Sequence, residues 1–304
     1  MAVCSKNDEG NAREGLTHPD CLLHIEDFSA FLANWEPKHE NIRTISKMLN
    51  IGIDSLVFAD DNPVERDIVQ SQEPSVAVPV FGSNVAKYIN IIDKAGYFEA
   101  VTLSSDDLQR SSYYAENIER EEHQGTFSNY DDFLLSLEMK AEIKPFSPIY
   151  IDRITQLINK TNQFNLTTRR YTQVEVENIA NDKNHITLYG RLYDKYGDNG
   201  VISIMIGEIR KREIHIDLWL MSCRVLKRGM EDVMFNHFVE MAQINNVQTL
   251  FGYYYPTPKN GMVSKLFEQM GFKKIEETDS GNTTWRFDIT KDYNCKATII
   301  EVNV

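Results

Sequence analysis

The sequence predicts an α/β protein in which a short parallel sheet is followed by a larger mixed α/β domain. In the first third of the chain, compact apolar runs alternate with amphipathic helical stretches, a pattern typical of parallel sheets. Farther on, apolar runs separated by turn residues such as Asp198-Asn199-Gly200 indicate antiparallel strands. With 304 residues and a hydrophobic fraction of 42%, the chain is long enough for about two domains with real cores.

An N-terminal domain is expected over residues 1–100. Met1 to Cys4 is expected to be a strand that runs into a polar loop, and residues 9–34 are expected to be partly helical. Pro37 suits the first position of a helix whose apolar residues recur at helical spacing. The remaining elements are expected to be a strand at 55–59, a helix at 64–70, a strand at 76–81 and a helix at 82–98.

A helical linker is expected over residues 101–125, and a second domain over residues 126–304. The linker ends in a charged run from Glu119 to His123. Helices are expected at 131–140 and 149–159, from Gly229 onward, and at 262–270, where Gly271 closes the last one. Strands are expected at 139–144, 186–192, 200–209, 213–220, 248–255 and 285–289.

Composition excludes several functional classes. The net charge of −13 argues against general nucleic-acid binding, which calls for a basic face. No apolar run approaches the roughly 20 residues that span a bilayer, and the N-terminus does not resemble a signal peptide. The four cysteines form no C-x-x-C pair, which favours free thiols in a reducing compartment. A cytoplasmic protein is therefore expected.

Two carboxylates follow an apolar strand in the first domain. Asp60 and Asp61 stand just past residues 55–59, where an α/β sheet places its ligands. Adjacent carboxylates can hold Mg²⁺, with water and phosphate completing its coordination. Lys38 at a helix start and Ser5 after the first strand are suited to phosphate. The sequence thus predicts a phosphate and metal site there.

A basic loop between a strand and a helix organises the second domain. Asp217 to Met221 reads as the end of a buried strand, and Ser222 to Arg228 as the loop. A helix that opens after such a loop leaves backbone N–H groups free beside cationic side chains. A phosphate or pyrophosphate group is therefore expected there. The same basic cluster is the best candidate contact for an acidic partner such as an acyl carrier protein.

Several segments resemble the FkbH-like branch of the haloacid dehalogenase (HAD) superfamily. They are AVCSKND, NWEPKHENI, LVFADDNPVERDIV, LSSDDLQRSSYYAENIERE and SCRVLKRGME. The resemblance implies that Ser5, Lys38 and Asp60 match the second, third and fourth motifs of the superfamily, with Asp61 beside the Mg²⁺ position. Members of the family load a glyceryl unit from a phosphorylated three-carbon donor onto an acyl carrier protein in polyketide-type biosynthesis.

One HAD motif does not occur in this sequence. The D-x-D-x-T loop that carries the nucleophilic aspartate would precede Met1, and without it no group attacks a phosphoryl centre. We therefore expect a partial HAD-like (Rossmannoid) parallel sheet that is not a phosphatase by itself. A HAD fragment supplied in trans, or a second copy of the chain in a homo-oligomer, could cover the open sheet edge. Robust Mg²⁺-dependent phosphatase turnover by this chain alone would contradict this expectation.

The second domain resembles the GNAT acyltransferase fold in its order of elements. Arg224 to Gly229 is similar to the family's R/Q-x-x-G-x-G/A loop, and Asn260 to Phe272 to its second CoA-side helix. The resemblance implies that CoA, acyl-CoA or a phosphopantetheine arm is bound at these segments. The residues implied are Cys223, Arg224, Val225, Leu226, Lys227, Arg228, Gly229 and Asn260.

Lys227 stands where the GNAT loop usually has its first glycine. Its side chain could crowd a pyrophosphate if the backbone needs a positive φ, or its ammonium could add to the phosphate site. The sequence does not decide between these alternatives.

Acid–base candidates are placed by strand alternation. Asp217 and Glu208 are candidate bases, and Tyr253, Tyr254 or Ser264 the candidate acid. Cys223 is a candidate acyl acceptor. Regular alternation predicts that His215, Asp217, Trp219 and Met221 share one face of their strand.

Three functions remain open from the sequence. The first is an acyltransferase of the FkbH-like kind. The second is a non-catalytic docking module for an acyl carrier protein or a HAD partner. The third is a lone acetyltransferase with a vestigial front.

Overall fold

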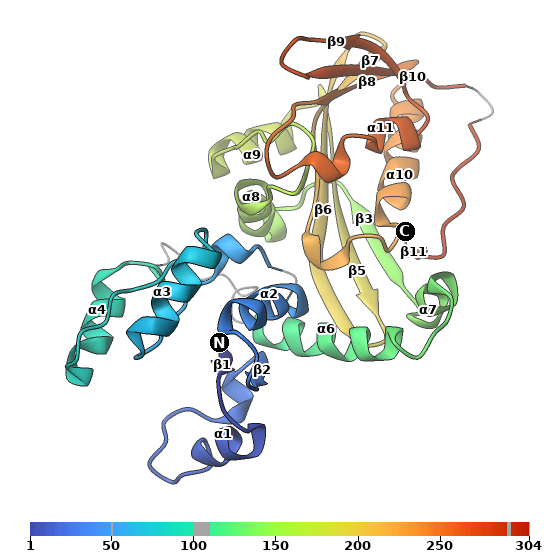
Figure 1. The fold of residues 1–304 in the computed structure, drawn as a ribbon. Coiled ribbons are helices and arrows are strands. Elements are labelled where there is room, and N and C mark those ends of the chain that lie inside the picture. Colours follow the sequence, from blue (N-terminus) through green and yellow to red (C-terminus); the bar gives the residue numbers. More distant parts are fainter. Residues whose placement is uncertain (50, 100–109, 291–292, 304) are drawn as a thin grey trace. The chain divides into compact units, whose positions relative to one another are not determined.

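The computed structural model describes residues 1–49, 51–99, 110–290 and 293–303 (Figure 1). The chain forms two compact units, Met1–Glu119 and Arg120–Val304. The α/β class is confirmed, because unit 1 combines parallel strands with helices and unit 2 is built on a mixed sheet. No helix within the described ranges combines the length and apolar character that crossing a bilayer requires.

Unit 1 holds two separate parallel pairings. Strand β1 (Ala2–Ser5) pairs in parallel with β2 (Ala30–Ala33), and Val57 forms a single parallel bridge with Ala77. Residues 9–34 are partly helical, as expected, but Ala30–Ala33 form a strand because their backbone bonds to β1. In place of the strands expected at 55–59 and 76–81, these segments form only that one bridge.

Helices α2 and α3 of unit 1 begin at residues that suit a helix N-terminus. Asn62 caps helix α3 through a hydrogen bond from Val64 N–H, and Pro63 takes its first position. Pro37 precedes helix α2 as its N-cap instead of occupying its first turn. The helices of this unit are α1 (Glu9–Gly15), η1 (Ile25–Asp27), α2 (Lys38–Met48), η2 (Ile53–Ser55), α3 (Pro63–Gln72), η3 (Val85–Lys87) and α4 (Tyr88–Lys94).

Helix α6 (Arg110–Gln124) occupies the described part of the expected linker. The boundary between the two units falls inside this helix, between Glu119 and Arg120. The first part of the expected linker, residues 101–109, lies outside the described residues. The domain limits of the sequence analysis stay a prediction.

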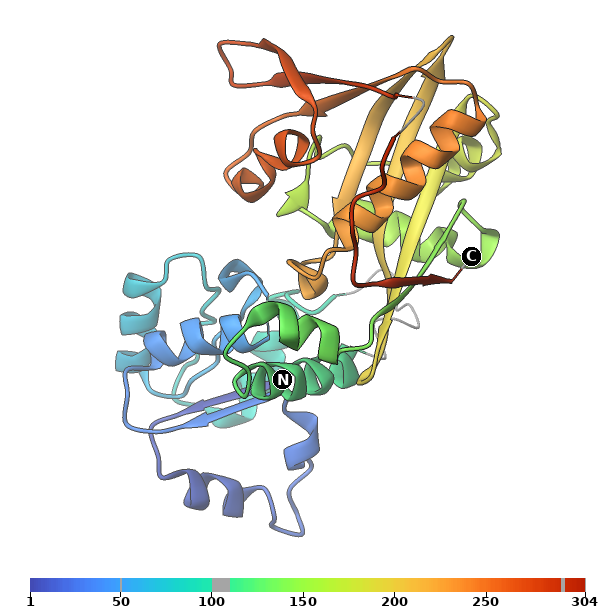
Figure 2. The same ribbon diagram turned by 90° about the vertical axis from the view of Figure 1, so that its right-hand side faces the viewer.

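Unit 2 is organised around a sheet in the order β11-β3-β5-β6-β7-β8-β10-β9, with β4 pairing to β7. The pairs β11–β3 and β7–β8 are parallel, and the others are antiparallel. Helices α8 and α9 lie on one face of the sheet, and α10 and α11 on the other (Figure 1). Figure 2 shows α10 lying across the face formed by β5, β6 and β7.

The order of elements expected from residue 126 onward is confirmed, with four elements that the sequence analysis missed. The missed elements are β4 (Phe164–Asn165), α9 (Gln173–Asn181), β9 (Lys273–Glu277) and β11 (Glu301–Asn303). The others are α7 (Tyr130–Ser136), β3 (Lys140–Lys144), η4 (Pro148–Tyr150), α8 (Ile151–Lys160), β5 (His185–Asp194), β6 (Gly197–Arg210), β7 (Glu213–Met221), η5 (Cys223–Val225), α10 (Met230–Ile244), β8 (Thr249–Tyr254), η6 (Gly261–Val263), α11 (Leu266–Gln269) and β10 (Thr283–Asp288).

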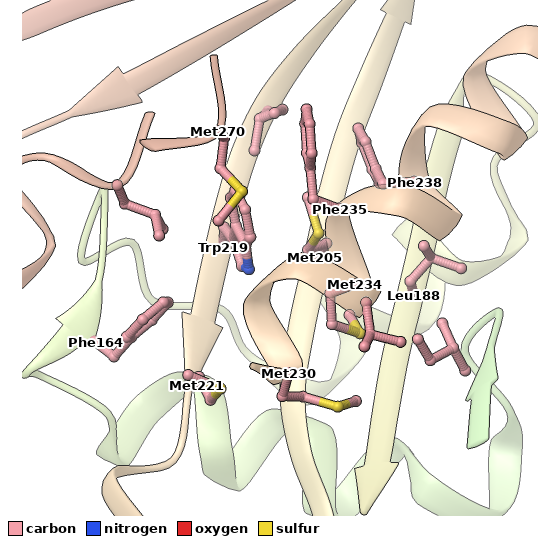
Figure 3. Close-up of a cluster of buried hydrophobic side chains, with 14 of the residues drawn as sticks. Phe164, Leu188, Met205, Trp219, Met221, Met230, Met234, Phe235, Phe238 and Met270 are labelled. Atoms are coloured by element: carbon pink, nitrogen blue, oxygen red, sulfur yellow. The ribbon is translucent and has the colours of Figure 1, made fainter. Parts of the chain in front are cut away.

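The sheet has an apolar core on each face. On the α8 and α9 face, Ile154, Leu157 and Ile158 pack against the strands. The larger core, on the α10 and α11 face, gathers aromatic and methionine side chains, among them Trp219, Phe235 and Met230 (Figure 3). Burial of such side chains removes apolar surface from water and stabilises the sheet and its helices as one unit.

Candidate functional site

The candidate site lies where β7 ends and helix α10 begins. Residues 222–229, called here the 222–229 loop, connect the two elements through the short turn η5. Gly229 is the N-cap of α10 with a φ of 85°, and Lys227 has a φ of 64°. Both residues therefore take the left-handed conformation that reverses the chain before the helix. That conformation is unstrained for glycine but costs free energy for a lysine.

The backbone donors of the loop remain open. Val225 N–H donates to the Ser222 carbonyl at 3.3 Å, and Val233 N–H donates to the Gly229 carbonyl at 3.4 Å. Between these two donors, the N–H groups of residues 226–230 find no acceptor among the described residues. Since the first N–H groups of a helix have no partner within it, these donors can bind an anion.

A buried charge network holds the loop, and Asp194 at the end of β5 is its centre. Arg120 Nε and Nη2 donate to the Asp194 carboxylate at 2.8 Å each, and Arg228 Nη1 donates to it at 3.2 Å. The Asp194 and Arg120 side chains are only 0% and 3% exposed. Two arginines thus share one buried carboxylate beside the loop.

Three further hydrogen bonds fix the loop, one within it and two that join it to other elements. Arg228 Nη2 donates to the Arg224 carbonyl at 3.1 Å, within the loop itself. Tyr130 at the start of α7 donates to the Lys227 carbonyl at 3.2 Å. Arg224 Nη2 in turn donates to the Asn199 carbonyl of β6 at 3.4 Å. The loop is therefore shaped mainly by residues distant in sequence.

The pKa shifts of Arg228 and Asp194 reflect burial and the charges of this network. Burial, together with the like charge of Arg120, lowers the pKa of Arg228 to about 10. Burial raises the pKa of Asp194, but the hydrogen bonds and charges of Arg120 and Arg228 outweigh it, so its pKa lies below the ordinary value. Arg228 and Asp194 are thus both charged at neutral pH.

The loop residues implied by the GNAT resemblance play different parts. Val225 is fully buried in the core and Leu226 packs against it, so Leu226 can offer a ligand only its backbone N–H. Lys227 is exposed, and its ammonium is free to reach an anion. Burial raises the pKa of the Cys223 thiol, which disfavours the thiolate that an acyl acceptor requires.

Two acidic residues stand near the loop in the first turn of α10, and one of them, Asp232, pairs with Lys296 at 3.0 Å. The other is Glu231. Its Oε2 atom is buried and has no hydrogen-bond partner among the described residues. Burial raises its pKa, so the carboxylate loses its charge more readily than an exposed glutamate.

Strands β7 and β8 diverge beyond Ile216 and Gly252, the last residues that pair in parallel. At the same point β7 has a bulge. Ile216 pairs with Gly207 of β6 and Leu218 pairs with the preceding Ile206, so Asp217 is the extra residue. We call this point the β7/β8 fork.

The bulge corrects the expected alternation along β7. Ile216 and Trp219 pack in the α10-face core, whereas Leu218 packs in the α8-face core. His215 and Asp217 therefore lie on the opposite face of β7 from Trp219 and Met221. The expectation that these four residues share one face is wrong, because an inserted residue shifts the two-residue period by one.

Asp217 is fully engaged at the fork. Arg169 Nη1 and the Tyr171 hydroxyl both donate to its carboxylate. The Thr167 hydroxyl donates to its carbonyl at 2.9 Å. Burial and the hydrogen bond to Asp217 raise the pKa of Tyr171 to about 12. Both carboxylate and carbonyl of Asp217 are therefore occupied by donors of the chain.

The other predicted acid–base groups are also paired. Glu208 forms an ion pair with Arg210 at 2.5 Å, which lowers the pKa of Glu208. The Tyr254 hydroxyl is buried and lies 3.4 Å from Asn260 Oδ1. Asn260 Nδ2 donates to the Asn165 and Tyr255 carbonyls at 2.9 Å each, and Oδ1 accepts from Thr257 N–H at 2.7 Å. The Asn260 side chain thus holds these backbone segments together, and it has no polar atom left for a cofactor.

The sequence analysis did not identify the histidine–tyrosine pair at the fork as part of a site. His215 Nδ1 lies 2.5 Å from the Tyr253 hydroxyl, and the two rings stack at an interplanar angle of 10°. Burial, with a contribution from Arg210, lowers the pKa of His215. Only the parallel pairing of β7 with β8 brings these residues together, so no local signal could have shown their contact.

A segment of the chain bridges the fork. Leu166 N–H donates to the Trp219 carbonyl of β7 at 3.2 Å, and Tyr255 N–H donates to the Leu166 carbonyl at 2.9 Å. Phe164 and Asn165 also pair with the end of β7 as strand β4. Residues 164–167 therefore occupy the space between the two strands in this conformation.

The residues predicted at the front of the chain come together in part. Lys38 Nζ lies 2.5 Å from Asp60 Oδ2, and both side chains are largely buried. Ser5 ends β1, and its carbonyl accepts from Asn34 N–H at 3.0 Å. Asp61 is exposed, and its carbonyl accepts from the buried Arg66 at 2.9 Å. The described residues contain no group of three or more metal-ligating side chains.

No family model matches the chain, and no curated protein matches it. Among solved structures, it is similar to the N-terminal part of BF1531 from Bacteroides fragilis, which contains a phosphatase domain complexed with Mg. The identity is 45% over 34% of this chain, with a TM-score of 0.33, and the match spans only 27% of that structure's chain.

Two structures of acetyltransferases match another part of the chain. The ribosomal-protein-S18-alanine N-acetyltransferase from Escherichia coli is 10% identical over 51% of this chain and 99% of its own, with a TM-score of 0.38. The GNAT domain of PAT from S. lividans is 12% identical over 48% and 89%, with a TM-score of 0.39. At these TM-scores, the function proposed below rests on the residues of this chain.

Replacement of Asp194 by asparagine tests the charge network. Asp194→Asn removes the buried carboxylate charge that Arg120 and Arg228 share, and we expect it to lower the free energy of unfolding by about 3–5 kcal/mol. The control is Glu208→Gln, which removes an exposed ion pair and should cost at most about 1 kcal/mol. Urea denaturation measures both, and equal losses would contradict the role of Asp194.

The same variant has a pH signature. Because the folded pKa of Asp194 lies below its unfolded value of about 3.9, its contribution is present above that pH and is lost as pH falls through the folded pKa. We therefore expect stability below about pH 4 to fall less steeply in Asp194→Asn than in the wild-type protein.

Proposed function

We propose that unit 2 is an acyltransferase-type domain whose 222–229 loop binds the phosphate or pyrophosphate of CoA or of a phosphopantetheine arm. One observation supports this most directly. The open N–H groups of residues 226–230 stand beside the two guanidinium groups, of Arg120 and Arg228, that bind Asp194. An anion at a helix N-terminus is stabilised both by such donors and by the helix dipole.

The residues around the loop fit the anionic part of such a ligand. The backbone of residues 226–230 would hold the phosphate oxygens, while Lys227 and Arg224 add charge from the side. Arg228 is too buried to reach outward and instead positions the loop. When bound, a CoA thioester supplies an activated acyl group. The protein's own part is to bind and orient it.

An acidic carrier protein is a suitable source of the arm. The chain carries a net charge of −13, so the loop is a local basic patch on an acidic protein. Such a patch attracts an acidic partner to this place and favours one orientation of it. The FkbH-like role, transfer of a glyceryl unit to an acyl carrier protein, belongs to this proposal.

A second function, a docking module for an acyl carrier protein, is favoured by the bridged fork. Leu166 fills the space between β7 and β8, and Asp217 and Glu208 are held in ion pairs. In this conformation the loop can grip a phosphate, but the arm has no path between the strands. A docking module requires only that the loop binds the phosphate.

Unit 1 is proposed to be a partner for other HAD elements and not a phosphatase by itself. Asp60 and Asp61 fit a Mg²⁺ ion bound through one or two carboxylates and water. Lys38 neutralises Asp60 in the present arrangement, so a metal would have to compete with it. A HAD fragment in trans or a second copy of the chain would supply what these residues lack.

Substitution of Lys227 by glycine tests the anion site. Lys227→Gly relieves the left-handed backbone and should raise stability by up to about 1 kcal/mol. It also removes an ammonium group, so CoA affinity measured by calorimetry should fall about 2- to 5-fold.

Lys211 provides the matched control. It also has a positive φ, 62°, but lies at the β6–β7 turn and not at the loop. Lys211→Gly should gain similar stability and leave CoA binding unchanged. Equal effects of both variants on CoA affinity would contradict the assignment of the loop.

Apo- and holo-acyl carrier protein distinguish the two functions. A transferase that uses the arm should bind the holo form more tightly than the apo form. It should also transfer an acyl group at a rate that Asp217→Asn lowers by about 10²- to 10⁴-fold. Equal binding of the two forms without any transfer supports docking, and binding of neither form, nor of CoA, rejects both.

A further inference from the structure

Trp219 is a fully buried side chain whose only polar atom has no partner. It lies on the α10 face of β7, stacked against Phe235 at 6.0 Å and edge-on to Phe267 at 6.2 Å between ring centroids. Its Nε1–H meets no acceptor among the described residues. An indole nitrogen can only donate, and buried donors are nearly always paired.

Another buried tryptophan shows the usual arrangement. Trp285 on β10 is 8% exposed, and its Nε1–H donates to the Thr283 hydroxyl at 2.8 Å. Both tryptophans pack against Phe267. The missing acceptor is thus particular to Trp219 and not a feature of this aromatic core.

The unpaired donor is turned toward the candidate site. Figure 3 shows the Trp219 nitrogen at the end of the ring nearer Met221 and Met230, away from Phe235. Met221 is the last residue of β7, and Met230 is the first of α10, so these two side chains flank the 222–229 loop. The donor and the open N–H groups of the loop therefore approach the same end of the strand.

The surroundings of this donor can adapt to a ligand. Met221 and Met230 are buried on the side of the ring that carries the nitrogen, and Met270 is buried at the other end of the ring (Figure 3). Methionine side chains are unbranched and flexible, so they can change rotamers at little cost. A chain entering beside the loop could displace them without unfolding the sheet.

We propose that Trp219 Nε1–H donates to a carbonyl group of the ligand whose phosphate binds the 222–229 loop. This inference rests on the proposed function and adds a specificity determinant to it. The favoured ligands are anionic chains that carry an amide or thioester carbonyl a short distance from the phosphate. Ligands with the phosphate alone gain nothing from this donor.

Binding of CoA and of inorganic pyrophosphate to the full chain tests the proposal. Trp219→Phe keeps an aromatic ring and removes the donor, so CoA affinity should fall about 2- to 12-fold while pyrophosphate affinity stays unchanged. Trp285→Phe removes a paired donor remote from the loop and should change neither affinity.

Each outcome decides the matter. Unchanged CoA affinity in Trp219→Phe overturns the proposal. Equal affinity of the wild-type protein for CoA and pyrophosphate overturns it as well, and leaves the anion site intact. Failure of the wild-type protein to bind either ligand rejects the proposed function, and this inference with it.

A second measurement covers the case in which Trp219→Phe does not fold. In a Trp35→Phe, Trp285→Phe background, Trp219 is the only tryptophan of the chain. Its fluorescence emission should shift on addition of CoA and not on addition of pyrophosphate. The absence of a shift with saturating CoA overturns the proposal.

Discussion

The arrangement of unit 2 around its loop depends on one carboxylate. Asp194 is buried at the end of β5 and holds two arginines, Arg120 from α6 and Arg228 from the loop. A single buried ion pair would be close to neutral in energy. Here two arginines converge on one carboxylate in a place of low dielectric constant, where charges act strongly on their surroundings. The same contact that shapes the loop thus places two guanidinium groups beside it.

The loop's own residues could not provide this shape alone. Lys227 occupies a left-handed conformation that a lysine adopts only at a cost, and Tyr130 and Arg228 hold the backbone on either side of it. A glycine would relax there without help. The lysine places a positive charge at the most exposed residue of the turn. The strained backbone and this additional charge therefore occur at the same residue.

The fork between β7 and β8 has the opposite character, because it is closed. The bulge at Asp217 turns the strand so that polar groups face one side and Trp219 the other. Leu166 then bonds to both strands. The backbone donors of the loop are thus open, whereas the neighbouring fork is closed.

Local patterns in the sequence determined the α/β class, the order of elements after residue 126 and the strand–loop–helix around Arg224. They could do so because helix and strand periods, turn residues and a helix start are properties of neighbouring residues. The sequence also identified Asp60 and Lys38 as candidate site residues, but it did not show that they contact each other.

Only the tertiary structure decided which charges meet. Nothing in the sequence near Asp194 points to Arg120 or Arg228, which lie 74 and 34 residues away along the chain. The bulge at Asp217 likewise appears only when β7 is paired with β6, and one inserted residue reverses the face of every side chain beyond it. Strand registers and buried ion pairs are set by the packing of distant segments, and a single sequence does not contain their geometry.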